Sequence, residues 1–303
     1  MALGHFSFDE STNISLSTPA KRSLIRSAQI KLNQILFRHY TNAPYISGDS
    51  IASLADYYVY GKTGTEPLIL KKLLHSRSVF LNSDKLDNFF AELKNIEISD
   101  LILITGNSDL NFIDFVPLPC KIKLWICQNN GMPFAPNIIT LPLGIENIRL
   151  GRLGLKKWYK RRGNEKKSTK ILVPPMSPTN EGRFLAVEFT KKNPELFDVH
   201  TSYLHERSYF NLVKKYQFIL CCEGNGFENH RTWEALYLGT FPVMLRTRWS
   251  ISLQYLNLPI LLVDSLEDLT EETVSQFAKD NRDFNPDYCD QLWIPFWKKV
   301  IQG

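Results

Sequence analysis

Short, continuous apolar runs alternate with segments of helical periodicity along most of this chain, and this alternation restricts the fold more than any other feature. Apolar runs of this kind, separated by helices or loops, are typical of strands buried in a largely parallel sheet. The clearest helical segments are residues 83–95, 204–216 and 269–281. The pattern therefore predicts an α/β protein, with strands within residues 78–82, 100–109, 122–130, 138–147, 170–174, 197–201, 217–222 and 259–265.

A strongly basic stretch, residues 149–170, divides this alternation into two parts. It holds ten Lys or Arg residues against one acid, so we expect it to connect two domains, either lining a cleft or forming a solvated linker. A chain of 303 residues is long enough for two domains. We predict two Rossmann-like, doubly wound domains that face a cleft, over residues 1–167 and 168–285, and a helix within residues 286–303 that returns to the first domain.

Charge and cysteine content narrow the class of protein. A net charge of +5 suits an anionic ligand, but the basic residues concentrate in one stretch and no RNA-binding aromatic motif is present, so we expect no nucleic-acid partner. The five cysteines include no CxxC pair and no zinc-like spacing, which predicts buried free thiols in a reducing compartment and no metal site. No signal peptide and no membrane-spanning run are evident, so we expect a cytoplasmic protein.

Two segments suggest an alternative location for the protein, at the inner face of a membrane. Residues 17–40 predict an amphipathic helix with a basic face, and the segment 288–302 combines aromatic residues with two lysines. Such segments either lie on an anionic lipid surface or pack on their own domain. Peripheral membrane contact and ordinary packing both remain open at this stage.

The segment 221–245, CCEGNGFENHRTWEALYLGTFPVML, places many special residues between two apolar runs. We expect a strand, a loop over residues 223–226, a helix over residues 230–238 with Asn229 as its N-cap, a turn at Gly239 and a second strand. The glycines of the loop tolerate unusual backbone angles and allow a ligand to approach the chain closely. Gly224, Asn225 and Gly226 are therefore predicted ligand-binding residues.

The helix of this segment has the residue types that a nucleoside diphosphate requires. Arg231 and Glu234 lie three residues apart and so share a face, near a helix N-terminus that attracts phosphate. Arg231 can clamp an anion, Glu234 can accept hydrogen bonds from the vicinal hydroxyls of a ribose, and His230 can touch phosphate or sugar. The alternative is an internal ion pair between Arg231 and Glu234 under a tight turn, with His230 an ordinary first-turn residue.

A second candidate anion site follows the strand at residues 170–174. There the segment SPTNEGR opens another helix, with Thr179 or Asn180 as its cap and Arg183 in its first turn. Two strand–loop–helix connections that each carry an arginine would suit a diphosphate. The alternative is that Arg183 is only a charged residue on the surface. In the first domain the expected strand ends are rich in polar residues and amides, and ligands of parallel sheets lie at such ends. These ends are residues 106–109, 128–130 and 144–147.

The segment 223–245 closely resembles the donor-binding signature of exostosin-like glycosyltransferases. In that family a glycine-containing loop precedes an Arg-x-Trp-Glu-Ala-Leu helix, a Gly turn and a Pro-Val strand. The resemblance is weaker but consistent over SPTNEGR (177–183), WICQNN (125–130) and LPLGIEN (141–147). The matching residues of the signature are Arg231, Trp233, Glu234, Ala235, Leu236, Gly239, Pro242 and Val243.

The resemblance implies the GT-B fold, with a nucleotide-sugar donor on residues 168–285 and a glycan or lipid-linked glycan acceptor on residues 1–167. It also implies a metal-independent transfer of a sugar to a hydroxyl, with no cofactor besides the donor substrate. Eukaryotic exostosins carry a membrane anchor and disulfides, which are not evident here. This departure points to a bacterial-type cytoplasmic relative that acts in surface polysaccharide biosynthesis.

An inverting transferase also needs a base near the acceptor hydroxyl. The candidates are Asp49 in ISGDS, Asp109 in GNSD and Glu223 in the glycine loop. For the two aspartates the alternative is a helix cap or an Asx-turn. A retaining enzyme can work without a protein base, and the sequence is compatible with either outcome. The alternative to an enzyme is a protein of the same fold that binds a nucleotide sugar or a glycan without transfer.

Overall fold

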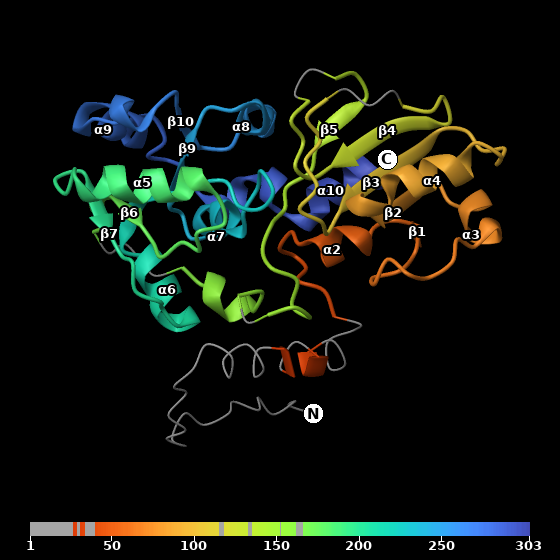
Figure 1. Ribbon diagram of the computed structural model, residues 1–303, viewed down its shortest axis with the longest axis horizontal. Coiled ribbons are helices and arrows are strands. Elements are labelled where there is room, and N and C mark those ends of the chain that lie inside the picture. The colour runs from red at the N-terminus through yellow and green to blue at the C-terminus, as the bar shows by residue number, and fades with distance from the viewer. Residues whose placement is uncertain are drawn as a thin grey trace.

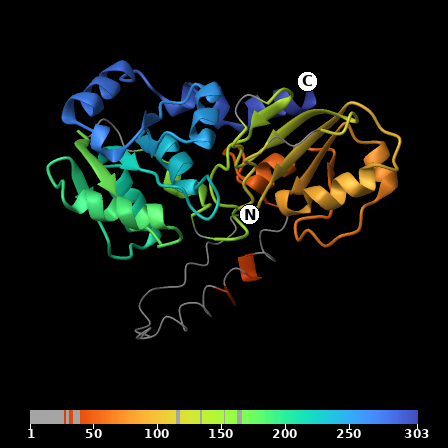
Figure 2. The same ribbon diagram turned by 45° about the horizontal axis from the view of Figure 1, so that its top comes forward.

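The computed structural model describes residues 27–28, 31–33, 40–114, 118–132, 135–151, 153–161 and 166–303. The chain forms two halves that lie side by side (Figure 1, Figure 2), each built on a parallel sheet of five strands. The predicted α/β class is therefore confirmed. Of the helix expected over residues 17–40, residues 27–28 and 31–33 are helical, Tyr40 is not helical, and the rest lies outside the described residues.

The N-terminal sheet runs in sequence order, β1-β2-β3-β4-β5, with every neighbouring pair parallel. Its elements are α2 (Gly48–Ala52), β1 (Tyr57–Tyr58), α3 (Leu70–Leu74), β2 (Ser78–Asn82), η1 (Ser83–Lys85), α4 (Leu86–Leu93), β3 (Leu101–Gly106), β4 (Ile122–Cys127) and β5 (Ile138–Thr140). The strand order does not reverse among these strands. The doubly wound arrangement that we predicted for both domains is thus absent from the described strands of this sheet.

The two faces of the N-terminal sheet are covered by helices from different parts of the chain. Successive side chains of a strand point to opposite faces. Val79 and Leu103 belong to the hydrophobic cluster that includes Leu73 of α3 and Phe89 of α4. The opposite face joins a cluster with residues of α2 and of the last helix, α10 (Ile294–Gln302), which returns from the far end of the chain (Figure 1).

The C-terminal sheet has the order β10-β9-β8-β6-β7, again with all neighbours parallel. Its elements are β6 (Ser168–Val173), α5 (Glu181–Lys191), β7 (Phe197–Val199), α6 (Glu206–Val213), β8 (Tyr216–Leu220), α7 (His230–Tyr237), β9 (Phe241–Leu245), α8 (Arg248–Ser252), η3 (Leu253–Leu256), β10 (Leu261–Val263), η4 (Leu266–Asp268) and α9 (Glu271–Asp280). Two short 3-10 turns, η5 (Pro286–Tyr288) and η6 (Asp290–Leu292), then lead to α10.

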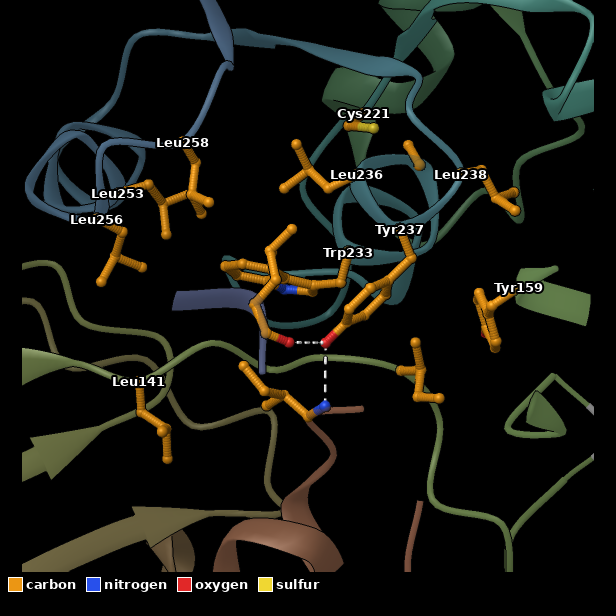
Figure 3. Packing of buried hydrophobic residues seen from close by; sticks show 14 of the residues in the cluster. Leu141, Tyr159, Cys221, Trp233, Leu236, Tyr237, Leu238, Leu253, Leu256 and Leu258 are labelled. Atoms are coloured by element: carbon orange, nitrogen blue, oxygen red, sulfur yellow. Dashed lines mark hydrogen bonds between the residues drawn. The ribbon is translucent and has the colours of Figure 1, made fainter. Parts of the chain in front are cut away.

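The two halves share one hydrophobic core around α7, part of which is drawn in Figure 3. Trp233, Leu236 and Tyr237 of α7 are buried in the same cluster as Leu141, which follows β5. The Tyr237 hydroxyl accepts a hydrogen bond from the backbone N–H of Ile46 at 3.0 Å and donates one to the carbonyl of Leu292 at 2.5 Å. One buried side chain thus ties together α7, the segment before α2 and the segment before α10.

The basic stretch between the sheets is partly structured. It contains η2 (Lys156–Tyr159), where Tyr159 is buried and Trp158 stacks on Phe210 of α6 at a centroid distance of 5.7 Å. Lys167 donates to the carbonyls of Leu238 and Gly239 at the end of α7, where the helix dipole favours a cation. The described part of this stretch therefore packs on the C-terminal half and also bonds to the N-terminal half, where Asn42 donates to the carbonyl of Gly154 at 2.7 Å, so it is no free linker.

The aromatic residues of α10 pack inside the protein. Trp297 is 1 % exposed, and its indole N–H donates to the carbonyl of Gln291. The two lysines, Lys298 and Lys299, are exposed. Among the described residues, no helix is both long and apolar enough to cross a membrane.

Candidate functional site

The C-terminal sheet has one place where its strand order reverses. The chain runs from β6 to β7 on one side and then returns to β8 on the other side of β6. Ligands of open parallel α/β sheets bind beyond the carboxyl ends of the strands at such a reversal. The flanking loops are residues 174–180, between β6 and α5, and residues 221–229, between β8 and α7. We call these two loops, with Arg183, Arg231 and Glu234, the switch-point site.

Asn180 joins the two loops of the switch-point site. Its side-chain oxygen accepts a hydrogen bond from the backbone N–H of Arg183 at 3.0 Å, so it is the N-cap of α5, as one of our two candidates predicted. Its side-chain N–H group donates to the carbonyls of Glu223 at 3.0 Å and Gly224 at 2.8 Å. The same side chain therefore starts a helix and holds the glycine loop.

Arg183 lies inside the site and is not a surface charge. It is 8 % exposed, and its Nε donates to the carbonyl of Glu223 at 2.7 Å, while Nη1 donates to the carbonyl of Ser177 at 3.1 Å. Its Nη2 lies beside Gly224, where an added Cβ would come within 3.3 Å. Burial, with a smaller contribution from the charge of Arg231, lowers the pKa of Arg183 from its usual value.

Arg231 occupies the first turn of α7 and reaches across to the other loop. Its Nη2 donates to the carbonyl of Pro175 at 3.1 Å. The charge of Arg231 contributes to the lowered pKa of Arg183, so the two predicted arginines belong to the same site. Two guanidinium groups at neighbouring helix N-termini favour an anion between them.

Glu234 is buried beside Arg231 but forms no ion pair with it in the described part of the chain. It is 2 % exposed, and its Oε2 accepts a hydrogen bond from the Tyr209 hydroxyl at 2.8 Å. Burial raises the pKa of Glu234 to about 7, although the Tyr209 hydrogen bond and the charge of Arg231 both lower it. The internal ion pair that we considered as an alternative for Arg231 and Glu234 is therefore not what this structure contains.

Four buried polar atoms at the start of α7 have no hydrogen-bond partner among the described residues: Asn229 Oδ1, Arg231 Nε, Thr232 Oγ1 and Glu234 Oε1. Buried polar groups in proteins almost always have a partner, so each such atom requires an explanation. The Thr232 hydroxyl can donate or accept, whereas the other three atoms have fixed roles: Arg231 Nε donates, and Asn229 Oδ1 and Glu234 Oε1 accept. A ligand that carries both hydroxyls and an anionic group, or ordered water in its place, can satisfy these three.

The glycines of the loop approach the opposite half of the protein. A Cβ added to Gly226 would lie 3.0 Å from the Asn129 side-chain amide and 3.1 Å from the carbonyl of Asp109. Asn225 is exposed, and its side-chain N–H group donates to Asp109 Oδ2 at 3.3 Å. Gly226 thus lies in close contact with the N-terminal half, and its contact with a ligand stays a prediction.

His230 faces the N-terminal half. Its Nδ1 lies 2.8 Å from the carbonyl of Gly144, and because a carbonyl only accepts, Nδ1 carries the proton in this contact. Burial lowers the pKa of His230, with opposing contributions from the Gly144 hydrogen bond and the charge of Asp109. In the neutral ring Nε2 is then the nitrogen that can accept a proton.

The three candidate bases lie in different surroundings. Asp49, in the first turn of α2, is 1 % exposed and forms an ion pair with Arg149 at 2.6 Å, within a separate network. Asp109 is exposed and meets the glycine loop through Asn225. Glu223 lies in the loop itself, and its Oε1 accepts a hydrogen bond from the Trp249 indole at 2.6 Å. The structure thus brings Asp109 and Glu223 to the switch-point site and places Asp49 elsewhere.

The strand ends of the N-terminal sheet gather as their polar character predicted, but they bond largely to one another. Asn107 accepts a hydrogen bond from the side chain of Asn147 at 2.8 Å, and its backbone N–H donates to the side chain of Gln128 at 2.9 Å. The side-chain N–H group of Asn107 donates to Asp49 Oδ1 at 3.4 Å and to the Tyr58 hydroxyl at 3.2 Å. These amides form a network that fixes the edge of the sheet.

Glu228 is a site residue that the sequence analysis missed. It is 5 % exposed, its Oε1 accepts from the backbone N–H of Asn129 at 2.9 Å, and its Oε2 accepts from the backbone N–H of Leu143 at 2.8 Å. The available signal was an acid next to the predicted N-cap, in the sequence GFENH. Its partners could not be read from that signal because they are backbone groups of the other half.

A cavity of about 880 Å³ lies along the edge strand β1 of the N-terminal half, lined by Tyr57, Tyr58, Lys62 and Arg149 among others. A smaller one of about 300 Å³ lies beside α6. The switch-point residues line neither of them. Within the ranges that the structure describes, no group of three or more His, Cys, Asp or Glu side chains is placed to hold a metal ion.

Comparison of the chain with protein-family models and with curated proteins gives no match. The fold and the site alone define the class of protein. It is a parallel α/β protein of two halves, with a candidate ligand site where the strand order of the C-terminal sheet reverses.

Proposed function

We propose that the protein is a glycosyltransferase of the GT-B type, which transfers a sugar from a nucleotide-sugar donor to a hydroxyl of a glycan or lipid-linked glycan. The nucleotide part of the donor would bind at the switch-point site, and the acceptor would approach from the N-terminal half. We assign the reaction to surface polysaccharide synthesis in the cytoplasm, without a metal ion.

The observation that carries this proposal is the set of groups at the start of α7. Arg183 and Arg231 from two helix N-termini interact electrostatically, beside buried polar atoms of Asn229, Arg231 and Glu234 that have no partner in the described chain. A diphosphate suits the two guanidinium groups, and vicinal hydroxyls suit the carboxylate oxygen of Glu234. The sequence resemblance over residues 223–245 independently supports the same class of ligand.

The proposed transfer would pass through an oxocarbenium-like transition state with negative charge growing on the leaving diphosphate. Arg183, Arg231 and the helix N-termini of α5 and α7 would stabilise that charge without reorganising. Loss of one such group typically raises the barrier by about 3–4 kcal/mol. For an inverting reaction Glu223 or Asp109 would accept the acceptor proton, because both lie at the glycine loop.

A second candidate, a protein that binds a nucleotide sugar or glycan without transfer, is favoured by one observation. Each predicted base is engaged: Asp49 with Arg149, Asp109 with Asn225 and Glu223 with Trp249. A binding protein needs no free carboxylate. Analysis of the sugar product with and without an acceptor distinguishes the two functions, because only the transferase consumes the donor in an acceptor-dependent way.

The first test is a thermal-shift screen of nucleotides and nucleotide sugars against the wild type and Arg231→Ala. A ligand that binds only the native state raises the melting temperature. At a free concentration one hundred times its dissociation constant, such a ligand adds about 2.7 kcal/mol to the free energy of unfolding. We expect at least one nucleoside diphosphate to stabilise the wild type and to lose this effect in Arg231→Ala.

The matched control is Arg246→Ala. Arg246 is an arginine of the same half that pairs with Asp264 at 3.0 Å on the surface. This variant should retain the nucleotide response. If no nucleotide stabilises the wild type, or if Arg231→Ala responds as the wild type does, the switch-point site does not bind the donor and the proposal is wrong.

A further inference from the structure

In addition to the bond from Asn225 to Asp109, four hydrogen bonds from one short loop join the switch-point site to the N-terminal half. Besides the two bonds that the Glu228 carboxylate accepts, its backbone N–H donates to the side-chain oxygen of Asn129 at 2.9 Å, and the N–H of Phe227 donates to the side chain of Asn111 at 2.8 Å. Glu228 and Asn129 thus bond reciprocally. The loop that carries the predicted ligand residues is held from the opposite half as well as by Asn180, Arg183 and Trp249 of its own half.

Glu228 also connects this contact to α7. Its Oε2 accepts a hydrogen bond from the indole N–H of Trp233 at 3.1 Å, and Trp233 is fully buried. Glu228 has no ion-pair partner among the described residues. A buried carboxylate without a cation, satisfied by backbone and indole N–H groups, is costly and is retained when it fixes a particular arrangement.

We propose that Glu228 is a positioning residue, which docks the loop of residues 223–229 on the N-terminal half and thereby holds Gly224 and Arg231 in place at the switch-point site. The part of this inference that concerns nucleotide binding rests on the proposed function. The docking itself does not, because it involves only residues of the protein. Glu228 touches no reacting atom and acts through the loop and through α7.

The docking contact has a characteristic pH dependence. Burial raises the pKa of docked Glu228 to about 7, against the lowering effect of the bonds from Asn129, Leu143 and Trp233. A carboxyl released into water has a pKa near 4.3. At a pH between these two pKa values, docked Glu228 is therefore protonated and released Glu228 is ionised. Docking should therefore weaken as the pH rises from about 4.5 to 7 and level off above 7.

Other titratable groups lie at this interface. Cys127 of β4 is buried, and its pKa is raised by burial and by the charge of Glu228. Asp109 follows β3 and meets Asn225, while His230 of α7 meets Gly144. Replacement of Glu228 alone is therefore needed to assign the pH dependence to it.

The test is hydrogen–deuterium exchange of the full chain, corrected for intrinsic exchange, in peptides that contain the amides of Asn129 and Leu143. In the wild type we expect protection of these amides to fall up to about tenfold per pH unit between pH 5 and 7. Glu228→Gln places an N–H group against one of the backbone donors, so protection should be lower at every pH and largely independent of pH. Unchanged protection or a retained pH dependence in this variant would overturn the proposal.

Glu223→Gln is the matched control, because Glu223 belongs to the same loop but bonds to Trp249 of its own half. This variant should keep the wild-type exchange of both amides. Should Glu228→Gln fail to fold, Asn129→Ala tests the same contact from the other half, since it removes the acceptor of the Glu228 N–H. Wild-type protection of the Leu143 amide in Asn129→Ala would then count against the docking role.

A second arm measures the affinity for the nucleoside diphosphate that gives the largest thermal shift. Glu228→Gln should weaken that affinity about tenfold or more, because the loop loses its support. Wild-type affinity in a variant whose loop has undocked would overturn the positioning role. If no nucleotide binds the wild type, the proposed function fails, and the exchange result still decides whether Glu228 docks the loop.

Discussion

Glu234 combines burial, one hydrogen bond and a neighbouring arginine within a single turn of α7. Its side chain is nearly inaccessible, Tyr209 bonds to one oxygen, and Arg231 is close but not paired with it. The charged form is disfavoured by the loss of water and favoured by both neighbours. The effect of burial is the largest of these, so the pKa of Glu234 in the folded protein is raised to about 7.

This balance gives a prediction for stability. The pKa of Glu234 is about 7 in the folded state and near 4.3 in the unfolded chain, so the folded state binds more protons between these values. The contribution of Glu234 to the free energy of unfolding should therefore fall by up to about 3 kcal/mol as the pH rises from 4.5 to 7. Urea unfolding of the wild type and Glu234→Gln at pH 5.5 and 7.5 measures the difference.

Tyr209→Phe serves as the companion variant. It removes the hydroxyl that favours the charged form of Glu234, so the loss of stability should extend to higher pH than in the wild type. A pH dependence identical in Glu234→Gln and the wild type would show that Glu234 does not cause it.

At the scale of elements, α5 begins at a residue that serves two functions. Asn180 caps the helix and also holds the carbonyls of Glu223 and Gly224. Asn180→Ala should cost the roughly 0.5–2 kcal/mol of a lost N-cap and, in addition, release the glycine loop. We expect lower stability in urea together with weaker binding of the nucleotide found in the thermal-shift screen.

Thr270, the N-cap of α9, provides the comparison. Its side chain accepts from the N–H of Thr273, and α9 carries no residue of the switch-point site. Thr270→Ala should therefore lower stability by a similar amount and leave nucleotide binding unchanged. Equal binding in the two variants would mean that Asn180 is only a helix cap.

The elements near the site could be predicted because their signals are local. Apolar runs indicated β2, β3, β4, β6 and β8, and the Asn180 cap and the Gly239 turn followed from residue preferences at helix ends. The two-residue strand β1 was not predicted, because Tyr57–Tyr58 is too short to show a period. Partners such as Tyr209 for Glu234, or Leu143 for Glu228, depend on how distant elements pack, which residue spacing does not encode.

At the scale of the whole molecule, the two halves share one hydrophobic core, so we expect them to unfold as one cooperative unit. Their sheets contribute to a single cluster around Trp233 and Tyr237, and α10 adds Trp297 and Ile301 to the same cluster. The sequence analysis predicted two domains around a cleft, and the return of a terminal helix is seen as α10 beside α2. The shared core could not be predicted, since each helix showed only that one of its faces is apolar.

A substitution in α10 should therefore destabilise both halves of the protein. Trp297→Ala removes a fully buried indole and leaves a cavity, at a cost of about 3–5 kcal/mol. We expect urea unfolding to shift to lower concentrations as one transition, seen alike by far-UV circular dichroism and by tryptophan fluorescence. Phe184→Ala, at a side chain that is 61 % exposed, should leave the midpoint nearly unchanged.

The path of the chain through α10 has a consequence for biosynthesis. The face of the N-terminal sheet that carries Phe80 and Ile104 is covered in part by Trp297 and Ile301, which are translated after the whole C-terminal sheet. While the ribosome is still adding β6 to β10, that face lacks its last helix and exposes apolar surface. The first half to emerge is thus the last to be completed, and a chaperone that shields apolar surface would find its binding site there until residues 294–302 arrive.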